Sequence, residues 1–256
     1  MDSFLQSFSL PASIPLFIAI YAVGYFSLFP QWKYKARFEA ASCSMSLVHG
    51  AISFTLAAYN LLHVPWQLDA PNSPHQNSLM DFSIAYFLVD LLHYVLFVPE
   101  DYKFIFHHVA TSIYMLTCKY YVGHGAVSVM ALMAVGEITT PLQSVWTIAR
   151  LGRVISPRAK RIYESASLPF TILFTVARGI VGPILTWKLC KFYLLNEGRQ
   201  VIPFWLAALW MGMVVIGMAG SVMWMQSYQF LHCVSKEVGI VDVRSTGAKC
   251  TAEDTY

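Results

Sequence analysis

The sequence predicts an all-α protein, a polytopic membrane bundle of about seven transmembrane helices. The chain is 57% hydrophobic and only 12% charged, whereas soluble domains average about 45–50% apolar and about 25% charged residues. Its aromatic share of 15% is also high, as expected where Trp and Tyr anchor helices at a lipid interface. A spanning helix needs about 20 mostly apolar residues, and seven stretches qualify: 11–29, 43–62, 79–98, 104–121, 125–148, 168–187 and 203–225.

These stretches divide the chain into three parts. The first ten residues, MDSFLQSFSL, lack the basic region of a signal peptide, and the apolar run behind them is long enough to remain in the bilayer. We therefore expect residues 1–31 to hold an N-terminal transmembrane helix and residues 32–230 to form a six-helix membrane domain. The polar residues 231–256 are expected to form a cytosolic tail.

The fourth stretch is the shortest, and it opens with two adjacent histidines, His107 and His108. It follows the segment PEDYK, whose proline and acidic residues suit the first turn and the positive dipole end of a helix. A GHG turn joins it to the fifth stretch. No internal repeat and no separate soluble domain interrupts this pattern.

The orientation follows from the basic residues between the stretches, because cytosolic loops of membrane proteins carry more Lys and Arg. With the N-terminus outside or in a lumen, four basic residues lie on the outer side: Lys119, Lys188, Lys191 and Arg199. Twelve lie on the cytosolic side: Lys33, Lys35, Arg37, Lys103, Arg150, Arg153, Arg158, Lys160, Arg161, Lys236, Arg244 and Lys249. This bias predicts a cytosolic C-terminus.

Several classes of protein are disfavoured. The net charge of +3 is small, so we expect no nucleic-acid partner. The five cysteines are widely spaced and form no CxxC pair, which supports neither a zinc ribbon nor a disulfide framework. A single HH pair lacks the repeated histidine boxes of membrane di-iron enzymes, and no nucleotide-binding or hydrolase motif occurs. We therefore expect no metal site and no resident cofactor.

Ionisable side chains lie inside the predicted helices, where they cost free energy and usually face the bundle interior. At a rise of about 1.5 Å per residue, they lie roughly 7–16 Å from the cytosolic ends of their helices. Scattered structural residues would occupy all depths, so this common layer indicates a polar cavity open to the cytosol. The residues in this layer are His49, Asp90, His93, His107, His108, Glu137 and Arg178.

The roles of these residues follow from their spacing and chemistry. Adjacent helical residues point about 100° apart, so we expect one histidine of the pair to face the cavity and the other to orient it. Arg178 is expected to be neutralised by Asp90 or Glu137. Plainer alternatives are a packing role for His49 and a proline kink at EITTP with threonine hydroxyls covering freed carbonyls. The candidate catalytic residues are His107, His108 and Asp90, and the candidate substrate-binding residues are His49, His93, Glu137 and Arg178.

Five segments in this order resemble the TLC domain family of membrane proteins, which includes the ceramide synthases. They are WKYKARFEAASCSMSLVHG, SIAYFLVDLLHY, FIFHHVATS, GEITTP and FTVARGIVGP, within residues 32 to 230. The resemblance implies an all-α bundle with a lipid-accessible cavity. In ceramide synthases the HH pair is essential to the N-acylation of a sphingoid base by acyl-CoA. AVGEITTPLQS stands here in place of the synthases' longer signature, so this chain is more similar to other TLC-domain-containing proteins than to ceramide synthases.

We therefore expect a multi-pass membrane protein that acts on a lipid, with acyl transfer in a cytosol-facing cavity as the leading reaction. A neutral histidine can accept a proton or an acyl group, and acyl-CoA could serve as co-substrate. The first alternative is a non-enzymatic lipid sensor, transfer factor or regulator of membrane composition, and the second is a seven-helix receptor. The expected partner is a membrane lipid or fatty acyl chain, and the expected location is the endoplasmic reticulum or another endomembrane, with the plasma membrane as the alternative.

Overall fold

The computed structural model describes residues 8–195 and 201–225, and every regular element in these two ranges is a helix. The first half contains α2 (Leu10–Val23), α3 (Tyr34–His63), α4 (Pro74–Phe97), α5 (Tyr102–Leu116) and α6 (Ala126–Glu137). The second half contains α7 (Thr140–Gly152), α8 (Pro157–Phe174), α9 (Gly182–Cys190) and α10 (Phe204–Met225). Short π-helical segments extend four of them: η1 (Gly24–Leu28), η2 (Thr117–Val122), η3 (Thr175–Val181) and η4 (Lys191–Leu195).

Among the described residues, six helices are long and apolar enough to cross a membrane: Leu10–Leu28, Tyr34–His63, Pro74–Phe97, Ala126–Gly152, Pro157–Leu195 and Phe204–Met223. The remaining predicted crossing is α5 with η2, whose histidines and lysines lower its hydropathy. At about 1.5 Å per residue it is still long enough to span the roughly 30 Å core of a bilayer. The all-α membrane bundle predicted from the sequence is confirmed.

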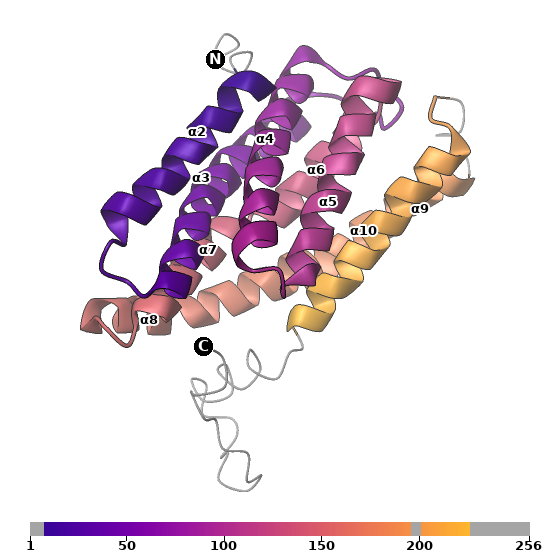
Figure 1. Cartoon of the computed structure of the whole chain (residues 1–256). Helices are drawn as coiled ribbons and strands as arrows, with labels where there is room; N and C mark the ends of the chain where they lie inside the picture. Colours follow the sequence, from indigo (N-terminus) through magenta and orange to yellow (C-terminus); the bar gives the residue numbers. More distant parts are fainter. Residues whose placement is uncertain (1–7, 196–200, 226–256) are drawn as a thin grey trace, which may run out of the picture.

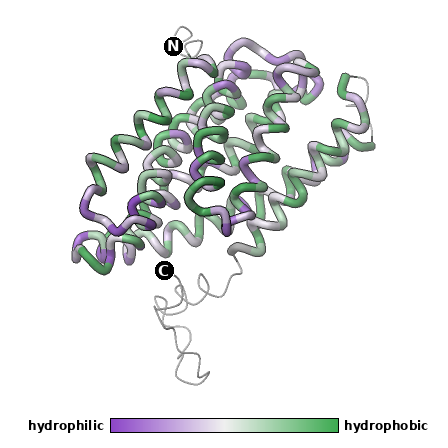
Figure 2. Tube along the Cα trace, in the orientation of Figure 1, coloured by the Kyte–Doolittle hydropathy of each residue, from purple (hydrophilic) through white to green (hydrophobic). Residues whose placement is uncertain are grey.

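The helices α2 to α6 lie side by side, and α2 begins at the end of the bundle opposite to the end of α10 (Figure 1). Hydrophilic residues gather in the connections at both ends of the bundle, as expected for helices that cross an apolar layer (Figure 2). The predicted polar tail lies outside the described residues.

The helix α4 occupies the middle of the bundle, in contact with α2, α3, α5 and α6. Every residue from 78 to 87 is buried, which is typical of a helix enclosed by other helices. The start of α4 is fixed by a capping box, in which the Ser73 side chain accepts from the backbone N–H of Gln76 and the Gln76 side chain accepts from the N–H of Ser73. Pro74 occupies the first turn, where its missing N–H costs nothing.

The sixth predicted stretch, 168–187, is much shorter than the helix that contains it. Residues Pro157–Leu195 form one continuous helical segment of 39 residues. Its length of roughly 58 Å exceeds the thickness of a bilayer core. The extra length is accounted for by α8, the first part of this helix, which runs across the end of the bundle near α7 (Figure 1). Arg158, Lys160 and Arg161 therefore lie on the first turns of a helix rather than in a loop.

Two interruptions of the helices position the site. The helix α6 ends at Glu137, and Pro141 in the first turn of α7 cannot donate the hydrogen bond that a continuous helix needs. The carbonyl of Gly136, freed by this break, accepts a hydrogen bond of 3.0 Å from the Thr139 hydroxyl. The second interruption is η3, a wide π-helical turn before Pro183, of a kind that is frequent at functional sites.

Candidate functional site

The most connected polar group in the membrane layer is Asp90 on α4, which is 1% exposed. Its Oδ2 atom lies 2.9 Å from Nε2 of His108 on α5 and accepts a bond of 3.2 Å from the Tyr86 hydroxyl. Its Oδ1 atom accepts a bond of 2.6 Å from the Ser42 hydroxyl on α3. Three helices thus meet at one carboxylate, so the group is fully hydrogen-bonded as burial requires.

His108 is 3% exposed, and both of its ring nitrogens are engaged. The Nδ1 atom lies 2.7 Å from the backbone carbonyl oxygen of Phe104, which can only accept, so Nδ1 carries a proton. The Nε2 atom therefore either donates to the Asp90 carboxylate or accepts from the protonated acid. In both cases the Asp90–His108 pair is neutral as a whole and leaves no ring nitrogen of His108 free for a ligand.

His107 has a different environment from its neighbour. Its ring stands edge-on to the ring of Phe87 at 5.9 Å and lies 5.6 Å from that of His108, at nearly a right angle. His107 lines a cavity. Among the hydrogen bonds of the described residues, none involves a ring nitrogen of His107, so either nitrogen could engage a molecule in the cavity.

The cavity has a volume of about 130 Å³ and lies between α5, α6, η3 and α10. Its polar side chains include His107, Glu137, Arg178 and Ser221. Much of the remaining wall is apolar and contains four methionines, Met115, Met133, Met213 and Met218, whose flexible side chains adapt to differently shaped ligands. Phe106 also lines the cavity and is 43% exposed, so part of its side chain lies at the outer surface of the bundle.

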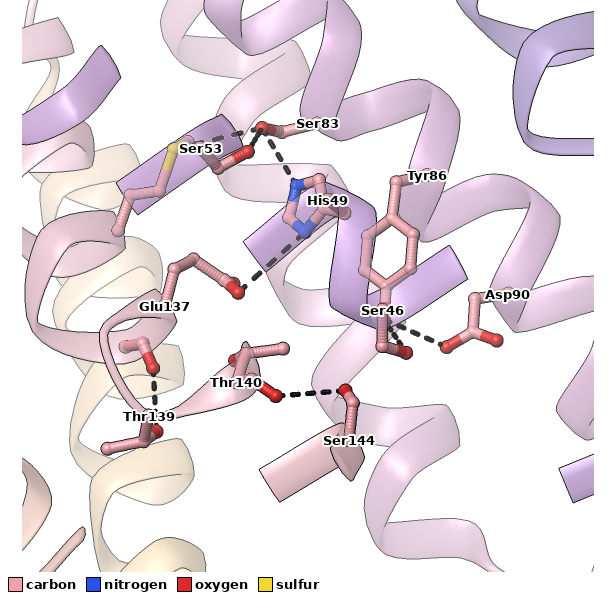
Figure 3. Close-up of polar contacts among 12 residues, drawn as sticks. Ser46, His49, Ser53, Ser83, Tyr86, Asp90, Glu137, Thr139, Thr140 and Ser144 are labelled. Carbon is pink, nitrogen blue, oxygen red and sulfur yellow. Dashed lines mark hydrogen bonds and ion pairs between the residues drawn. The ribbon is translucent and has the colours of Figure 1, made fainter. Parts of the chain in front are cut away.

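Glu137 ends α6 and is 9% exposed. Its Oε2 atom lies 3.7 Å from Nδ1 of His49, an ion-pair contact if the histidine is protonated (Figure 3). Neither atom has a hydrogen-bond partner. Gly50 permits this approach, because a Cβ at that position would lie 3.2 Å from Oε2 of Glu137 and only 2.7 Å from Cβ of Thr140. The glycine after His49 therefore allows α3 to pack directly against the break between α6 and α7.

His49 itself is completely buried and does not line the cavity. Its ring stacks on that of Tyr86 at 4.0 Å, and its Nε2 atom lies 3.1 Å from the Ser83 hydroxyl (Figure 3). The histidine thus lies behind Glu137, on the side away from the cavity. It contacts two residues of the cavity wall, Glu137 and Phe87, whose ring lies 5.4 Å from its own.

Arg178 was expected to be neutralised by Asp90 or Glu137, and it does attract Glu137, but without a direct ion pair. No carboxylate among the described residues lies within 4.0 Å of the Arg178 guanidinium. It donates instead to the Gly136 carbonyl at 3.0 Å and to the Ser221 hydroxyl at 3.2 Å. The physical reason is that Asp90 is already satisfied by His108, while the freed carbonyl beside Glu137 provides a strong acceptor for the arginine.

His93 lies apart from the cavity. It is buried against α2, where its Nδ1 atom lies 3.1 Å from the Tyr21 hydroxyl. The structure therefore brings His107, Glu137 and Arg178 to one cavity, places Asp90 with His108 and places His49 behind Glu137. Among the described residues, no group of three or more His, Cys, Asp or Glu side chains could hold a metal ion.

Sequence reasoning missed several residues that complete this arrangement. Tyr86 precedes Asp90 by four positions, so its place on the same helical face could have been found. Ser42 and Ser221 come from distant helices, and ordinary serines in apolar stretches carry no signal of their partners. The methionines of the wall are equally common as core residues.

The fold and the enclosed polar groups define a multi-pass membrane protein whose helical bundle contains a mostly apolar cavity with a few polar side chains. The chain belongs to the TLC domain family, whose model matches residues 39–228. It is similar to the "TLC domain-containing protein At5g14285" of Arabidopsis thaliana, with 38% identity over 218 residues that cover 84% of this chain and 86% of that protein. The family predicted from the five sequence segments is confirmed.

Proposed function

We propose that this protein acts on a membrane lipid in the cavity between α5, α6, η3 and α10, with His107 as the reactive group. The observation that carries the proposal is the contrast within the histidine pair. His108 has both ring nitrogens bonded to internal partners, whereas His107 lines the cavity with its ring nitrogens unengaged. The link from His108 to Asp90 fixes α5 on α4, and this contact holds the His107 ring toward the cavity.

Acyl transfer is the reaction that these groups support best. A neutral His107 could take the proton of an amine or hydroxyl as this group attacks an acyl donor, or could itself form an acyl-imidazole. With a thioester donor such as acyl-CoA, the carbonyl carbon bonds to the acceptor and the thiolate leaves. Arg178, with N–H groups near the same cavity, would stabilise the oxyanion that develops on the carbonyl oxygen.

A second function, lipid binding without turnover, is favoured by one observation. A catalytic base is usually oriented by a third group bonded to its second nitrogen, and no such bond to the His107 ring exists among the described residues. A sensor, transfer factor or regulator of membrane composition would need only the cavity. Both functions place a lipid against His107.

We also propose that the end of the bundle carrying the α2–α3 and α7–α8 connections faces the cytosol, and that the chain resides in the endoplasmic reticulum or another endomembrane. The support for this orientation is the excess of Lys and Arg in these connections and on the adjoining helix ends. When depth is counted along the helices from this end, the candidate site residues share one half of the bilayer.

Turnover can be tested with purified protein in liposomes of phosphatidylcholine and phosphatidylethanolamine, supplied with radiolabelled oleoyl-CoA. The acyl-transfer proposal predicts a labelled lipid product that accumulates over many turnovers and is absent with His107→Ala. Co-purification of unreacted lipid with the protein, with no labelled lipid product formed, would instead support the binding function. A product formed equally by His107→Ala would overturn the role of this histidine.

A further inference from the structure

The cavity wall carries one positive and one negative side chain that are not paired with each other. Glu137 and Arg178 both line it, yet no direct ion pair joins them among the contacts of the described residues. We infer that the cavity binds the headgroup of a zwitterionic lipid, with its oxyanion at Arg178 and its cationic group at Glu137. The inference rests on the proposed function, because it names the class of lipid that would lie against His107.

Arg178 is held by neutral acceptors and so retains its charge for a ligand. Its two hydrogen bonds go to the Gly136 carbonyl and to the Ser221 hydroxyl. A guanidinium has five N–H donors, and the Nε atom of Arg178 is buried with no partner. The residue is thus oriented by the protein and left incompletely bonded, as expected for an anion-binding arginine.

Glu137 is incompletely bonded in the same way. Its Oε2 atom is buried without a hydrogen bond. Nδ1 of His49 lies 3.7 Å away, which is within ion-pair range for a protonated histidine but beyond hydrogen-bonding distance. The Thr140 side chain lies beside the carboxylate and can donate to it, but a hydroxyl brings no compensating charge. A cationic group in the cavity would supply that charge.

Glu137 and Arg178 attract each other at a distance, but among the described residues no charged group makes a hydrogen bond to either of them. Asp90 and His108 neutralise each other at 2.9 Å, and the rest of the cavity wall is largely apolar. Separated charges in such surroundings are costly unless a partner of opposite charge is bound. A fatty acid would satisfy Arg178 alone, an amine would satisfy Glu137 alone, and a neutral glyceride would compensate neither.

The size of the cavity fits a headgroup rather than a whole lipid. Its volume of about 130 Å³ is small beside the ~300–1,000 Å³ of typical small-molecule pockets. The exposed Phe106 at its edge and the methionines of its wall offer an apolar path along which acyl chains could leave toward the bilayer. The charged part of the lipid would then lie against His107.

The test is a competition among four probes with the same oleoyl chain, offered at equal concentration to the purified full-length protein in detergent. The probes are lysophosphatidylethanolamine (zwitterionic), lysophosphatidic acid (anionic), oleylamine (cationic) and monoolein (neutral), and native mass spectrometry measures which one is retained. We expect about tenfold preference for the zwitterionic probe, which corresponds to ~1.4 kcal/mol. Glu137→Gln should shift the preference to lysophosphatidic acid, and Arg178→Gln should shift it to oleylamine.

Matched controls are Glu39→Gln and Arg150→Gln, which remove the same charges from a partly exposed ion pair of 2.9 Å whose residues do not line the cavity. They should retain the wild-type ranking. If Arg178→Gln does not fold, the Glu137→Gln arm still decides. An unchanged ranking in Glu137→Gln, or no preference in the wild type, overturns the inference. Neither result depends on turnover by His107, so the proposed function is judged separately.

Discussion

Nε2 of His108 lies 2.9 Å from Oδ2 of Asp90, and this contact joins α5 to α4 in the buried centre of the bundle. Removal of one partner of a buried pair lowers the free energy of unfolding by about 3–5 kcal/mol in soluble proteins, because the other partner is left uncompensated. The contact between Asp90 and His108 should therefore stabilise the fold whether or not a lipid is bound.

Asp90→Ala and His108→Ala should each lower the melting temperature in detergent substantially, and the double variant should lose less than the sum of the two. The reason is that the second substitution removes the group that the first one left unpaired. Differential scanning fluorimetry of the four proteins measures this coupling. Strictly additive losses would show that the two side chains do not interact.

Gly50 provides a second prediction about packing. Gly50→Ala places a methyl group 2.7 Å from Cβ of Thr140 and 3.2 Å from the Glu137 carboxylate, so the helices must separate. Overpacking of this kind costs about 1–3 kcal/mol, and we expect a lower melting temperature together with altered lipid retention.

Gly212→Ala is the matched control, because a Cβ at that position meets no atom within 4 Å. Alanine is the better helix former by about 1 kcal/mol, so this variant should be as stable as the wild type or slightly more stable. Equal stability of Gly50→Ala and Gly212→Ala would contradict the close packing of α3 on the α6–α7 break.

The orientation can be tested with a C-terminal epitope tag. The excess of basic residues at one end predicts that protease added to sealed microsomes removes the tag, while a lumenal marker protein remains protected. Protection of the tag until detergent is added would invert the proposed topology, and the cavity would then open from the other side.

Much of this architecture could be predicted from the sequence. Apolar stretches of sufficient length identified the helices, and a shared depth identified the layer that contains His107, Glu137 and Arg178. Depth follows from position along a helix, whereas contact depends on how each helix is rotated about its axis, and apolar residues on all sides of α4 conceal that rotation. The groups that Arg178 contacts directly could therefore not be predicted, since several acidic and basic groups lie at similar depth.

The full length of the helix containing α8 could not be predicted, for a different reason. The segment SPRAKRIYES is polar, and polarity between apolar stretches is typical of a loop. Its serine and proline are nevertheless a signal for a helix start, and the Ser156 side chain does accept from the backbone N–H of Ala159. A helix that runs across the end of the bundle needs no apolar stretch at its beginning.

The most direct test of the central claim compares His107→Ala, His108→Ala and the wild type in cells that lack the endogenous protein, with the total lipid profile and the melting temperature measured for each. We expect His107→Ala to melt near the wild-type temperature and to abolish the effect of the protein on the lipid profile. His108→Ala should lower the melting temperature, because it breaks the contact with Asp90. A folded His107→Ala protein that changes cellular lipids as the wild type does would contradict the account.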